Sequence, residues 1–430
     1  MRTRWLFVLV VVAGSLVGWP KPALAQEEVR RALSRLAPVF GKSALYSRKG
    51  KEDIYTIARR YGVSASDLYN ANDGDLLLGD ELLLIPMQRI APVPSVDGLV
   101  VNLAERGLYF YTNGRASRRF PVAVGMQGWE TPTGDYTIAN KAKNPTWFPP
   151  EWAAEEHPVP PGPDNPLGDR WMGLSIKGYG IHATNAPASI GRYSSHGCMR
   201  MYPEHAHALF ELVKVGTPAK IVYEQLAIGY QPEEGILYLA HYPDPYRMGG
   251  VTRDWVASRL KPYGLAWVAR LPAVGEALER PRGVPMPVLG SSKRVSVNGR
   301  QVEFAIGPTW VGADWLVPAG PLVSALGAEM EVGPGGNYVV IVREPHRLFF
   351  SPGDAEVLVD GQLVTAGAAP QMAAGHPLVP LKTTATGLGC SVGRDDWSDA
   401  VLVWDGSGPG RTGVVVGRPP AGAPSSGPYR

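Results

Sequence analysis

Hydrophobic residues recur with helical spacing near the start of the chain. One face of a predicted helix carries apolar residues at positions i, i+3, i+4 and i+7, namely Ile54, Ile57, Ala58 and Tyr61. Gly62 can end this helix as a C-cap, and Ser64 can cap a second helix over residues 65–70. Apolar segments on either side predict two strands, at 44–47 and 82–85. The pattern predicts a small strand–helix–helix–strand module over residues 44–88, with a minimal core.

Short apolar segments separated by turns follow over residues 96–224. Asn113-Gly114 is a strong hairpin signal, because a type I′ turn needs positive φ at both central positions. The spacing predicts a helix over 206–213 and a closing strand over 219–223. Residues 144–170 are rich in proline and aromatic residues and predict a semi-rigid loop. We therefore expect a mainly-β domain in this part of the chain.

Residues 225–286 carry a weaker pattern, which we interpret as an extension or helical linker. It contains one candidate strand at 236–241 and two segments with helical spacing, at 253–260 and 267–278.

An internal repeat marks residues 287–406. Leu316-Val317-Pro318 recurs as Leu378-Val379-Pro380, and Leu326-Gly327 recurs as Leu388-Gly389. Each copy reads as a proline that opens a helix, a glycine that ends it, and a strand. The repeat predicts an α+β domain of two similar halves. The Gly/Pro/Ser-rich stretch 407–430 is typical of a disordered tail.

The first 25 residues have the layout of a secretory signal peptide. Arg2 and Arg4 precede an apolar run that ends in Ala23-Leu24-Ala25, an A-x-A cleavage site. An uncleaved membrane anchor is the alternative, and residues 26–43 follow as a leader. Cleavage removes three basic residues and no acid, so the formal charge of +3 becomes zero. A nucleic-acid partner therefore has no electrostatic support, and no later segment is apolar enough to span a membrane.

The candidate chemistry lies between residues 181 and 201. This stretch holds His182, His196 and Cys198, one of only two cysteines in the chain. A cysteine attacks as the thiolate, so we expect a neighbouring base or positive charge to lower its pKa. Gly197 allows a tight turn that presents N–H groups to an oxyanion.

The string Ser195-His196-Gly197-Cys198-Met199-Arg200, with His182 upstream, resembles the active-site signature of the YkuD-type L,D-transpeptidases. Thr131-Pro132-Thr133-Gly134 is similar to the TPxG turn of that family, while Ala183 replaces its usual glycine. The resemblance implies that Cys198 is the nucleophile and His182 the general base. It further implies oxyanion or orienting roles for His196, Gly197 and Ser195, and substrate binding by Arg200 and Tyr179. It implies no metal and no cofactor.

Two further resemblances define the expected multidomain fold class. The 44–88 module resembles a LysM domain, which binds the N-acetylated glycan of peptidoglycan. The repeat domain resembles the copper amine oxidase N-terminal-like stalk domain, without implying copper. We therefore expect a bacterial, exported or wall-associated enzyme that acts on peptidoglycan stem peptides, with a βααβ LysM module, a mainly-β YkuD-like domain and an α+β repeat domain.

Two other functions remain open at this stage. One is a Cys-His hydrolase that transfers the acyl group of the stem peptide to water. The other is a non-catalytic wall-binding protein. A Cys198–Cys390 disulfide would consume the proposed nucleophile, so we expect both thiols to be free.

Overall fold

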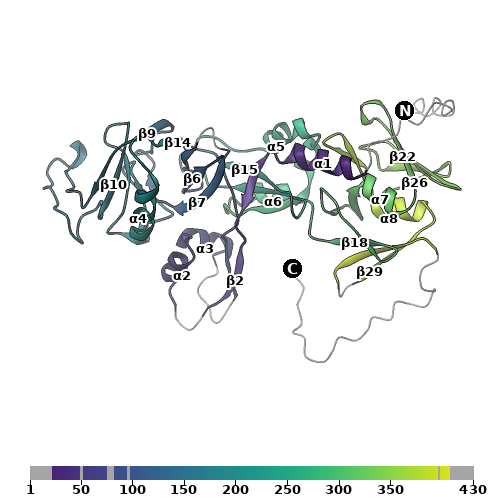
Figure 1. Cartoon of the computed structure of the whole chain (residues 1–430), viewed down its shortest axis with the longest axis horizontal. Helices are drawn as coiled ribbons and strands as arrows, with labels where there is room; N and C mark the ends of the chain where they lie inside the picture. The colour runs from purple at the N-terminus through teal and green to yellow at the C-terminus, as the bar shows by residue number, and fades with distance from the viewer. Residues whose placement is uncertain (1–21, 49–51, 75–81, 94–96, 396–397, 407–430) are drawn as a thin grey trace.

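The computed structural model describes residues 22–48, 52–74, 82–93, 97–395 and 398–406. Figure 1 shows an elongated molecule with strands of the expected catalytic domain (residues 96–224) at one end, α7 and α8 at the other, and a small module projecting from the middle. Most of the predicted signal peptide and the predicted tail lie outside the described residues. No helix within the described residues is long and apolar enough to cross a membrane.

An eight-stranded sheet forms the body of the catalytic domain, in the order β13-β11-β10-β9-β14-β5-β6-β7. A two-stranded ribbon, β12-β8, lies beside it. The strands are β5 Gly98–Asn102, β6 Gly107–Thr112, β7 Arg115–Pro121, β8 Val124–Gly125, β9 Gly134–Lys143, β10 Arg170–Leu174, β11 Gly180–His182, β12 Tyr193–Ser195, β13 Met199–Arg200 and β14 Pro218–Val222. The predicted turn at Asn113-Gly114 joins β6 to β7, and both residues have positive φ.

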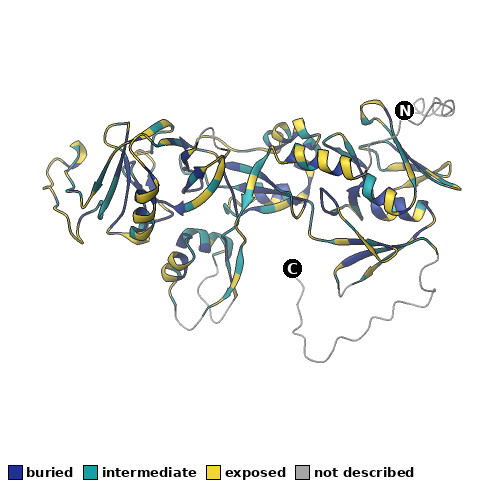
Figure 2. Cartoon of the chain, viewed as in Figure 1, coloured by how far each residue is buried: buried dark blue, intermediate teal, exposed yellow. Residues whose placement is uncertain are grey.

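Apolar packing covers this sheet on both faces around β5. All five residues of β5 are buried. Leu99 and Val101 join the catalytic core with helix α4 (Pro203–Leu212), while Val100 faces Tyr109 and Tyr111 in a smaller cluster. Figure 2 shows buried residues in the sheet interiors and exposed residues on the outer faces of the helices. A strand buried on both faces gives the site a rigid base.

The small module has the four elements that the sequence predicts. They are β2 Ala44–Ser47, α2 Ile54–Arg60, α3 Ala65–Ala71 and β3 Leu82–Ile85, and β2 pairs with β3 in antiparallel register. Ser64 caps α3, and Asp67 completes a capping box by accepting the Ser64 N–H. Gly62 follows α2 in the left-handed conformation, as expected for its C-terminus.

The module is docked on the catalytic domain. Arg59 makes two contacts with Glu204 at 2.5 and 2.6 Å, and Arg192 donates to the Tyr55 hydroxyl at 3.0 Å. Gly191 lies so close to Ser64 that an added Cβ would stand 2.3 Å from its side chain. The docking surface therefore includes the chain on either side of the candidate nucleophile.

A buried ring of four alternating charges connects the two units. Arg89 of β4 (Arg89–Ile90) lies 3.2 Å from Asp67 and 3.6 Å from Glu105, while Arg119 lies 3.6 Å from Asp67 and 3.2 Å from Glu105. The Tyr109 hydroxyl also contacts both carboxylate oxygens of Glu105. Burial alone would raise the pKa of Asp67, but Arg89 and Arg119, with smaller contributions from Arg106 and the Ser64 N–H, outweigh it and lower that pKa to about 2.

The leader and the extension fold together, which the sequence did not predict. A five-stranded sheet runs in the order β17-β16-β15-β1-β4, so that β1 from the leader lies between elements from distant parts of the chain. The strands are β1 Ala37–Phe40, β15 Leu226–Gln231, β16 Ile236–His241 and β17 Met286–Leu289. The helices are α1 Pro22–Leu33, α5 Arg253–Leu260 and α6 Pro272–Glu279, with 3₁₀ turns at Lys261–Tyr263 and Ala266–Arg270.

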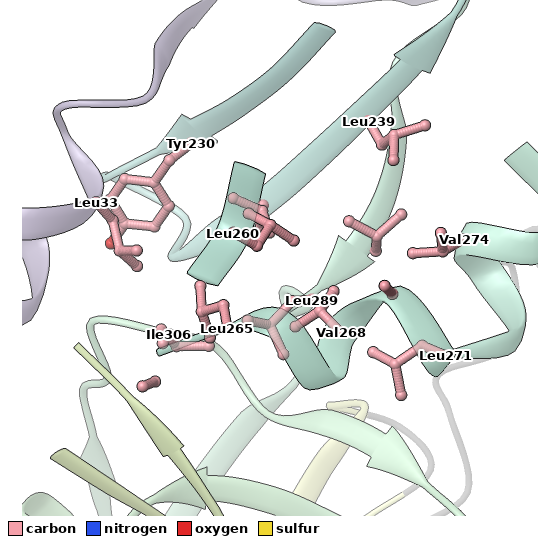
Figure 3. Packing of buried hydrophobic residues seen from close by; sticks show 14 of the residues in the cluster. Leu33, Tyr230, Leu239, Leu260, Leu265, Val268, Leu271, Val274, Leu289 and Ile306 are labelled. Carbon is pink, nitrogen blue, oxygen red and sulfur yellow. The ribbon is translucent and has the colours of Figure 1, made fainter. Parts of the chain in front are cut away.

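Packing explains why these segments cannot be separate linkers. Leu33 of α1, Tyr230 of β15 and Leu260 of α5 are buried in one cluster that extends to Ile306 of the repeat domain (Figure 3). The helix predicted over 267–278 is divided instead, because Pro272 begins α6 and cannot donate a backbone hydrogen bond to the preceding turn.

The C-terminal domain has the predicted two-fold repeat. Leu316-Val317-Pro318 of one copy pairs antiparallel with Leu378-Val379-Pro380 of the other, so the two copies meet at Val317 and Val379. Helices α7 (Ala319–Ala325) and α8 (Leu381–Gly387) follow the two prolines. The strands are β18 Arg294–Val297, β19 Arg300–Val302, β20 Thr309–Val311, β21 Asp314–Pro318, β22 Glu329–Val332, β23 Val339–Arg343, β24 His346–Phe350, β25 Glu356–Val359, β26 Gln362–Thr365, β27 Gln371–Ala373, β28 His376–Pro380, β29 Ser391–Asp395 and β30 Ala400–Trp404.

The buried charge ring predicts a large loss of stability when one charge is removed. Glu105→Gln leaves Arg89 and Arg119 with one carboxylate between them, so we expect a destabilisation of about 3–5 kcal/mol. Thermal unfolding followed by circular dichroism measures it. The matched control is Glu204→Gln, which breaks an exposed ion pair with Arg59 and is expected to cost less than about 1 kcal/mol. Equal shifts for both variants would contradict a stabilising role of the ring.

Candidate active site

Strand pairing brings the two ends of the predicted motif together. β11 and β13 run parallel, with Ile181 opposite Met199 and His182 opposite Arg200. The Met201 N–H also donates to the His182 carbonyl at 2.8 Å. Cys198 immediately precedes β13, so the pairing places the imidazole and the thiol at the same edge of the sheet.

Both side chains line one cavity of about 430 Å³. Its walls come from the proline-rich loop, β10 and the β10–β11 connection, the end of β11, and the loop that carries Cys198 together with β13. The lining residues are Pro145, Thr146, Trp147, Phe148, Pro150, Trp152, Pro166, Leu167, Trp171, Gly178, His182, Ser195, His196, Cys198 and Arg200. Five of the seven residues predicted for the site therefore line the cavity; Gly197 and Tyr179 do not.

His182 is a buried, neutral base. Its Nδ1 lies 2.5 Å from the Ala183 carbonyl oxygen, which can only accept, so Nδ1 carries the proton and Nε2 keeps its lone pair. Burial lowers the pKa of His182 to about 4, and the positive charge of Arg200 contributes in the same direction. Trp171 stacks on the ring at a centroid distance of 5.9 Å and shields it from solvent.

The Cys198 thiol is held as the neutral form. Its Sγ lies 3.5 Å from the Gly178 carbonyl oxygen, to which it can donate. Burial raises the pKa of Cys198, and Arg200 only partly offsets this effect. Its neighbours do lower the thiol pKa, as expected, through the Gly180 backbone and the charge of Arg200, but desolvation outweighs both and the net direction is upward.

Arg200 presents a positive charge to the cavity. Within the described part of the chain, its guanidinium makes no hydrogen bond or ion pair, although its backbone pairs with Ala123 at 2.9 and 3.0 Å. An unpaired guanidinium in a partly buried cavity is suited to bind a carboxylate in bidentate fashion.

The loop before Cys198 is fixed by the Ser195 hydroxyl. Ser195 Oγ accepts the Gly197 N–H at 3.1 Å and donates to the Cys198 carbonyl at 2.5 Å. The Gly197 N–H is therefore occupied and cannot serve an oxyanion in this conformation. The backbone N–H groups of His196 and Cys198 make no hydrogen bond within the described residues, and they remain the candidate donors.

His196 lies between two tryptophans. Its ring stacks on Trp152 at a centroid distance of 3.9 Å and meets Trp129 edge-on at 4.9 Å. Trp152 belongs to the 144–170 loop, so this loop contacts His196, two residues before the candidate nucleophile Cys198. The buried Asn165 amide ties the loop together by donating to the carbonyl groups of Pro145, Val159 and Pro160.

Tyr179 lies behind the nucleophile loop and is not among the residues that line the cavity. Its ring packs against Gly197, where an added Cβ would lie 2.5 Å from the tyrosine Cε1. Gly197 also has a φ of +107°, so both backbone conformation and space require glycine. Tyr179 thus supports the nucleophile loop from behind, and substrate binding by this residue stays a prediction.

Sequence reasoning missed the aromatic partners of the two histidines. Trp129 and Trp171 lie outside the motif and carry no spacing signal that would join them to it. Thr131 belongs to the recognised TPxG turn, but only the fold shows that its hydroxyl reaches the Gly197 carbonyl at 2.8 Å. Within the described residues no group of three or more His, Cys, Asp or Glu side chains is placed to hold a metal, and Cys198 and Cys390 are both free thiols, as expected.

Comparison with known families matches two parts of the chain. Residues 97–221 match the L,D-transpeptidase catalytic domain, YkuD, and residues 296–403 match the copper amine oxidase N-terminal domain. The NMR structure of the catalytic domain of an Enterococcus faecium L,D-transpeptidase is 24% identical, with a TM-score of 0.25, over 30% of this chain and 98% of that one.

Curated relatives extend the match. The probable L,D-transpeptidase YcfS of Escherichia coli is 34% identical over 44% of this chain and 65% of the relative, so the chain spans slightly less than two thirds of that protein. The probable L,D-transpeptidase ErfK/SrfK of Salmonella typhimurium is 31% identical over 55% of this chain and 78% of the relative. Its Escherichia coli counterpart is 30% identical over 57% and 84%, respectively. The match to the catalytic domain and these relatives together show that the chain belongs to the L,D-transpeptidase family.

Proposed function

We propose that this protein cross-links peptidoglycan by L,D-transpeptidation. The observation that carries the proposal is a single cavity that holds a cysteine thiol, a neutral histidine with a free lone pair and an unpaired arginine. These groups supply a nucleophile, a proton acceptor and a carboxylate-binding cation. A tetrapeptide stem offers the matching parts, namely an amide to be cut and free carboxylates.

The acylation step follows from the arrangement of these groups. Cys198 Sγ attacks the carbonyl carbon at the L-centre of the diaminopimelate residue, and its proton passes to Nε2 of His182. The N–H groups of His196 and Cys198 stabilise the oxyanion. When the tetrahedral intermediate collapses, the C–N bond breaks, and the terminal D-Ala leaves with the proton that His182 held. A thioester remains on Cys198.

The second step consumes the thioester. The side-chain amine of a neighbouring stem attacks the same carbonyl carbon, His182 accepts its proton, and the thiolate leaves and is reprotonated. Arg200 binds a substrate carboxylate throughout. The aromatic residues Trp147, Phe148 and Trp152 of the 144–170 loop line the cavity and would lie around the thioester.

The docked module supports a second contact with the cell wall. Its βααβ order matches that of a LysM domain, and we propose that it binds the N-acetylated glycan strand while the catalytic domain handles the peptide. Since the module is fixed against the chain around residues 190–204, the glycan and the stem peptide would be bound at a set separation. The enzyme would then act outside the cytoplasm, as an exported, wall-associated protein.

Product analysis tests the reaction. Incubation with disaccharide-tetrapeptide should yield a dimer whose mass equals two monomers less one alanine, detected by mass spectrometry. Cys198→Ala should give no dimer, while Cys390→Ala, which removes the other thiol, should behave like the unmodified protein. A tripeptide monomer in place of the dimer would show that water is the acceptor and that the protein is a hydrolase.

The pH dependence of turnover tests the neutral Cys–His pair. Protonated imidazole has no lone pair, and burial lowers the pKa of His182 to about 4. We therefore expect kcat/KM to stay level as the pH falls through 6.5, the usual value for histidine, and to decline only as it approaches about 4. His182→Ala should lower kcat by roughly 10²–10⁴-fold.

Alkylation of Cys198 by iodoacetamide provides the matching measurement. The rate should rise with pH through a midpoint above about 8.5, because burial raises the thiol pKa. His182→Ala should leave that midpoint nearly in place, since the imidazole is uncharged where the thiol titrates. A midpoint below pH 7 that shifts upward in His182→Ala would instead reveal a thiolate–imidazolium pair.

Binding to insoluble peptidoglycan tests the module. The inactive Cys198→Ala chain should sediment with purified peptidoglycan, and soluble oligomers of N-acetylglucosamine should release it, because they carry the glycan without the peptide. Sedimentation that these oligomers leave unchanged would contradict glycan binding by the module and assign the interaction to stem peptides.

A further inference from the structure

Two hydroxyl groups fix the peptide planes on either side of Gly197. Ser195 Oγ accepts the Gly197 N–H at 3.1 Å, and Thr131 Oγ1 donates to the Gly197 carbonyl at 2.8 Å from the opposite side. A trans peptide bond is planar, so the Cys198 N–H points away from the Gly197 carbonyl. Holding that carbonyl therefore fixes the direction of a candidate oxyanion donor.

Thr131 is itself firmly placed. Its side chain is 2% exposed, and its hydroxyl accepts the Gly125 N–H at 3.0 Å. The hydroxyl has a single proton, which is directed to the Gly197 carbonyl. A Cβ added to Gly125 would lie 2.1 Å from the Trp129 carbonyl oxygen, so the turn packs closely against this strand. Gly125 and Thr131 therefore form one rigid unit behind the nucleophile loop.

The hydrogen bonds that position Gly125 and Thr131 extend to residues outside 97–221, the part of the chain that matches the catalytic domain. The Tyr246 hydroxyl donates to the Gly125 carbonyl at 2.6 Å. Its ring stacks on Tyr223 with a centroid distance of 4.9 Å and an interplanar angle of 18°. Asp244 fixes the intervening turn by accepting the Tyr223 hydroxyl at 2.7 Å and the N–H groups of Met248 and Gly249, both at 3.2 Å.

We propose that Thr131 and Tyr246 are positioning residues that set the direction of the Cys198 N–H during acyl transfer. The Tyr246 hydroxyl donates to the Gly125 carbonyl, and the Gly125 N–H donates to the Thr131 hydroxyl. The Thr131 hydroxyl in turn donates to the Gly197 carbonyl. Gly197 has no Cβ to restrict its rotation, so without this contact the Gly197–Cys198 peptide can turn. A displacement of about 1 Å at a reacting group can cost roughly 100-fold in rate. The inference rests on the proposed function, because it concerns catalysis at the same thiol.

Substitutions in the full-length chain distinguish the effect of the Thr131 hydroxyl from the effect of the side-chain volume. Thr131→Val keeps the volume and removes the hydroxyl, and it should lower kcat for disaccharide-tetrapeptide by about 10- to 100-fold with KM within about twofold. Thr131→Ser restores the hydroxyl and should recover the rate to within about threefold. Tyr246→Phe keeps the stacked ring and should lower kcat by about 3- to 10-fold, because it acts through one more contact.

Thr133→Val is the matched control. This residue lies in the same turn, is exposed, and its hydroxyl makes no hydrogen bond within the described residues. It should leave kcat unchanged. If Thr131→Val also retains the rate of the unmodified protein, or if Thr131→Ser is as slow as Thr131→Val, the inference is overturned.

Two thiol-directed probes, one acylating and one alkylating, distinguish this inference from the proposed function. A carbapenem, whose strained β-lactam carbonyl mimics the scissile amide, forms a tetrahedral oxyanion, whereas iodoacetamide needs only the thiolate. Thr131→Val should slow carbapenem adduct formation, followed by intact-protein mass spectrometry, and leave the pH profile of alkylation in place. This pattern in a protein that forms no cross-links would sustain the inference and refute the function. Parallel losses with both probes would indicate a disrupted loop and refute the inference.

Discussion

A buried charge is costly unless an opposite charge lies close to it. The ring of Asp67, Arg89, Glu105 and Arg119 meets this requirement, and much of the architecture depends on it. No single unit could bury these charges alone. Asp67 comes from the small module, Arg89 from the central sheet, and Glu105 and Arg119 from the catalytic domain. Their pairing is satisfied only when all three units are assembled, so the ring makes the assembly specific as well as compact.

Desolvation also determines the protonation states at the site. The same burial that would destabilise a lone charge keeps both His182 and Cys198 neutral before substrate arrives. The resting protein therefore avoids a standing thiolate, which is the form that oxidants attack. In the proposed mechanism, proton transfer to His182 accompanies the attack on the carbonyl, and backbone N–H groups stabilise the developing negative charge.

Local sequence signals predicted the elements of the module, the hairpin at Asn113-Gly114 and the two-fold repeat, because each depends on residues close in sequence or on an exact recurrence. The family resemblance also identified five of the residues that line the cavity, but not Trp171 or the other aromatic residues around it. The local signals could not show that β1 inserts between β15 and β4, because the pairing of strands far apart in the sequence produces no periodic pattern of hydrophobic residues. The orientation of Ser195 was equally hidden: its hydroxyl occupies the Gly197 N–H, and only the folded loop shows this.

The insertion of β1 has a consequence for the order of events during synthesis. β1 pairs with β15 at Ala37 and Gly229, so one of the first segments to be made must wait for a partner from the middle of the chain. Contacts of such long sequence separation form late and slow the folding of a domain. The turn that carries Tyr246 is made later still. Under the proposed role of Tyr246, the support of the loop that carries Cys198 is complete only after residues well beyond the cysteine have been made.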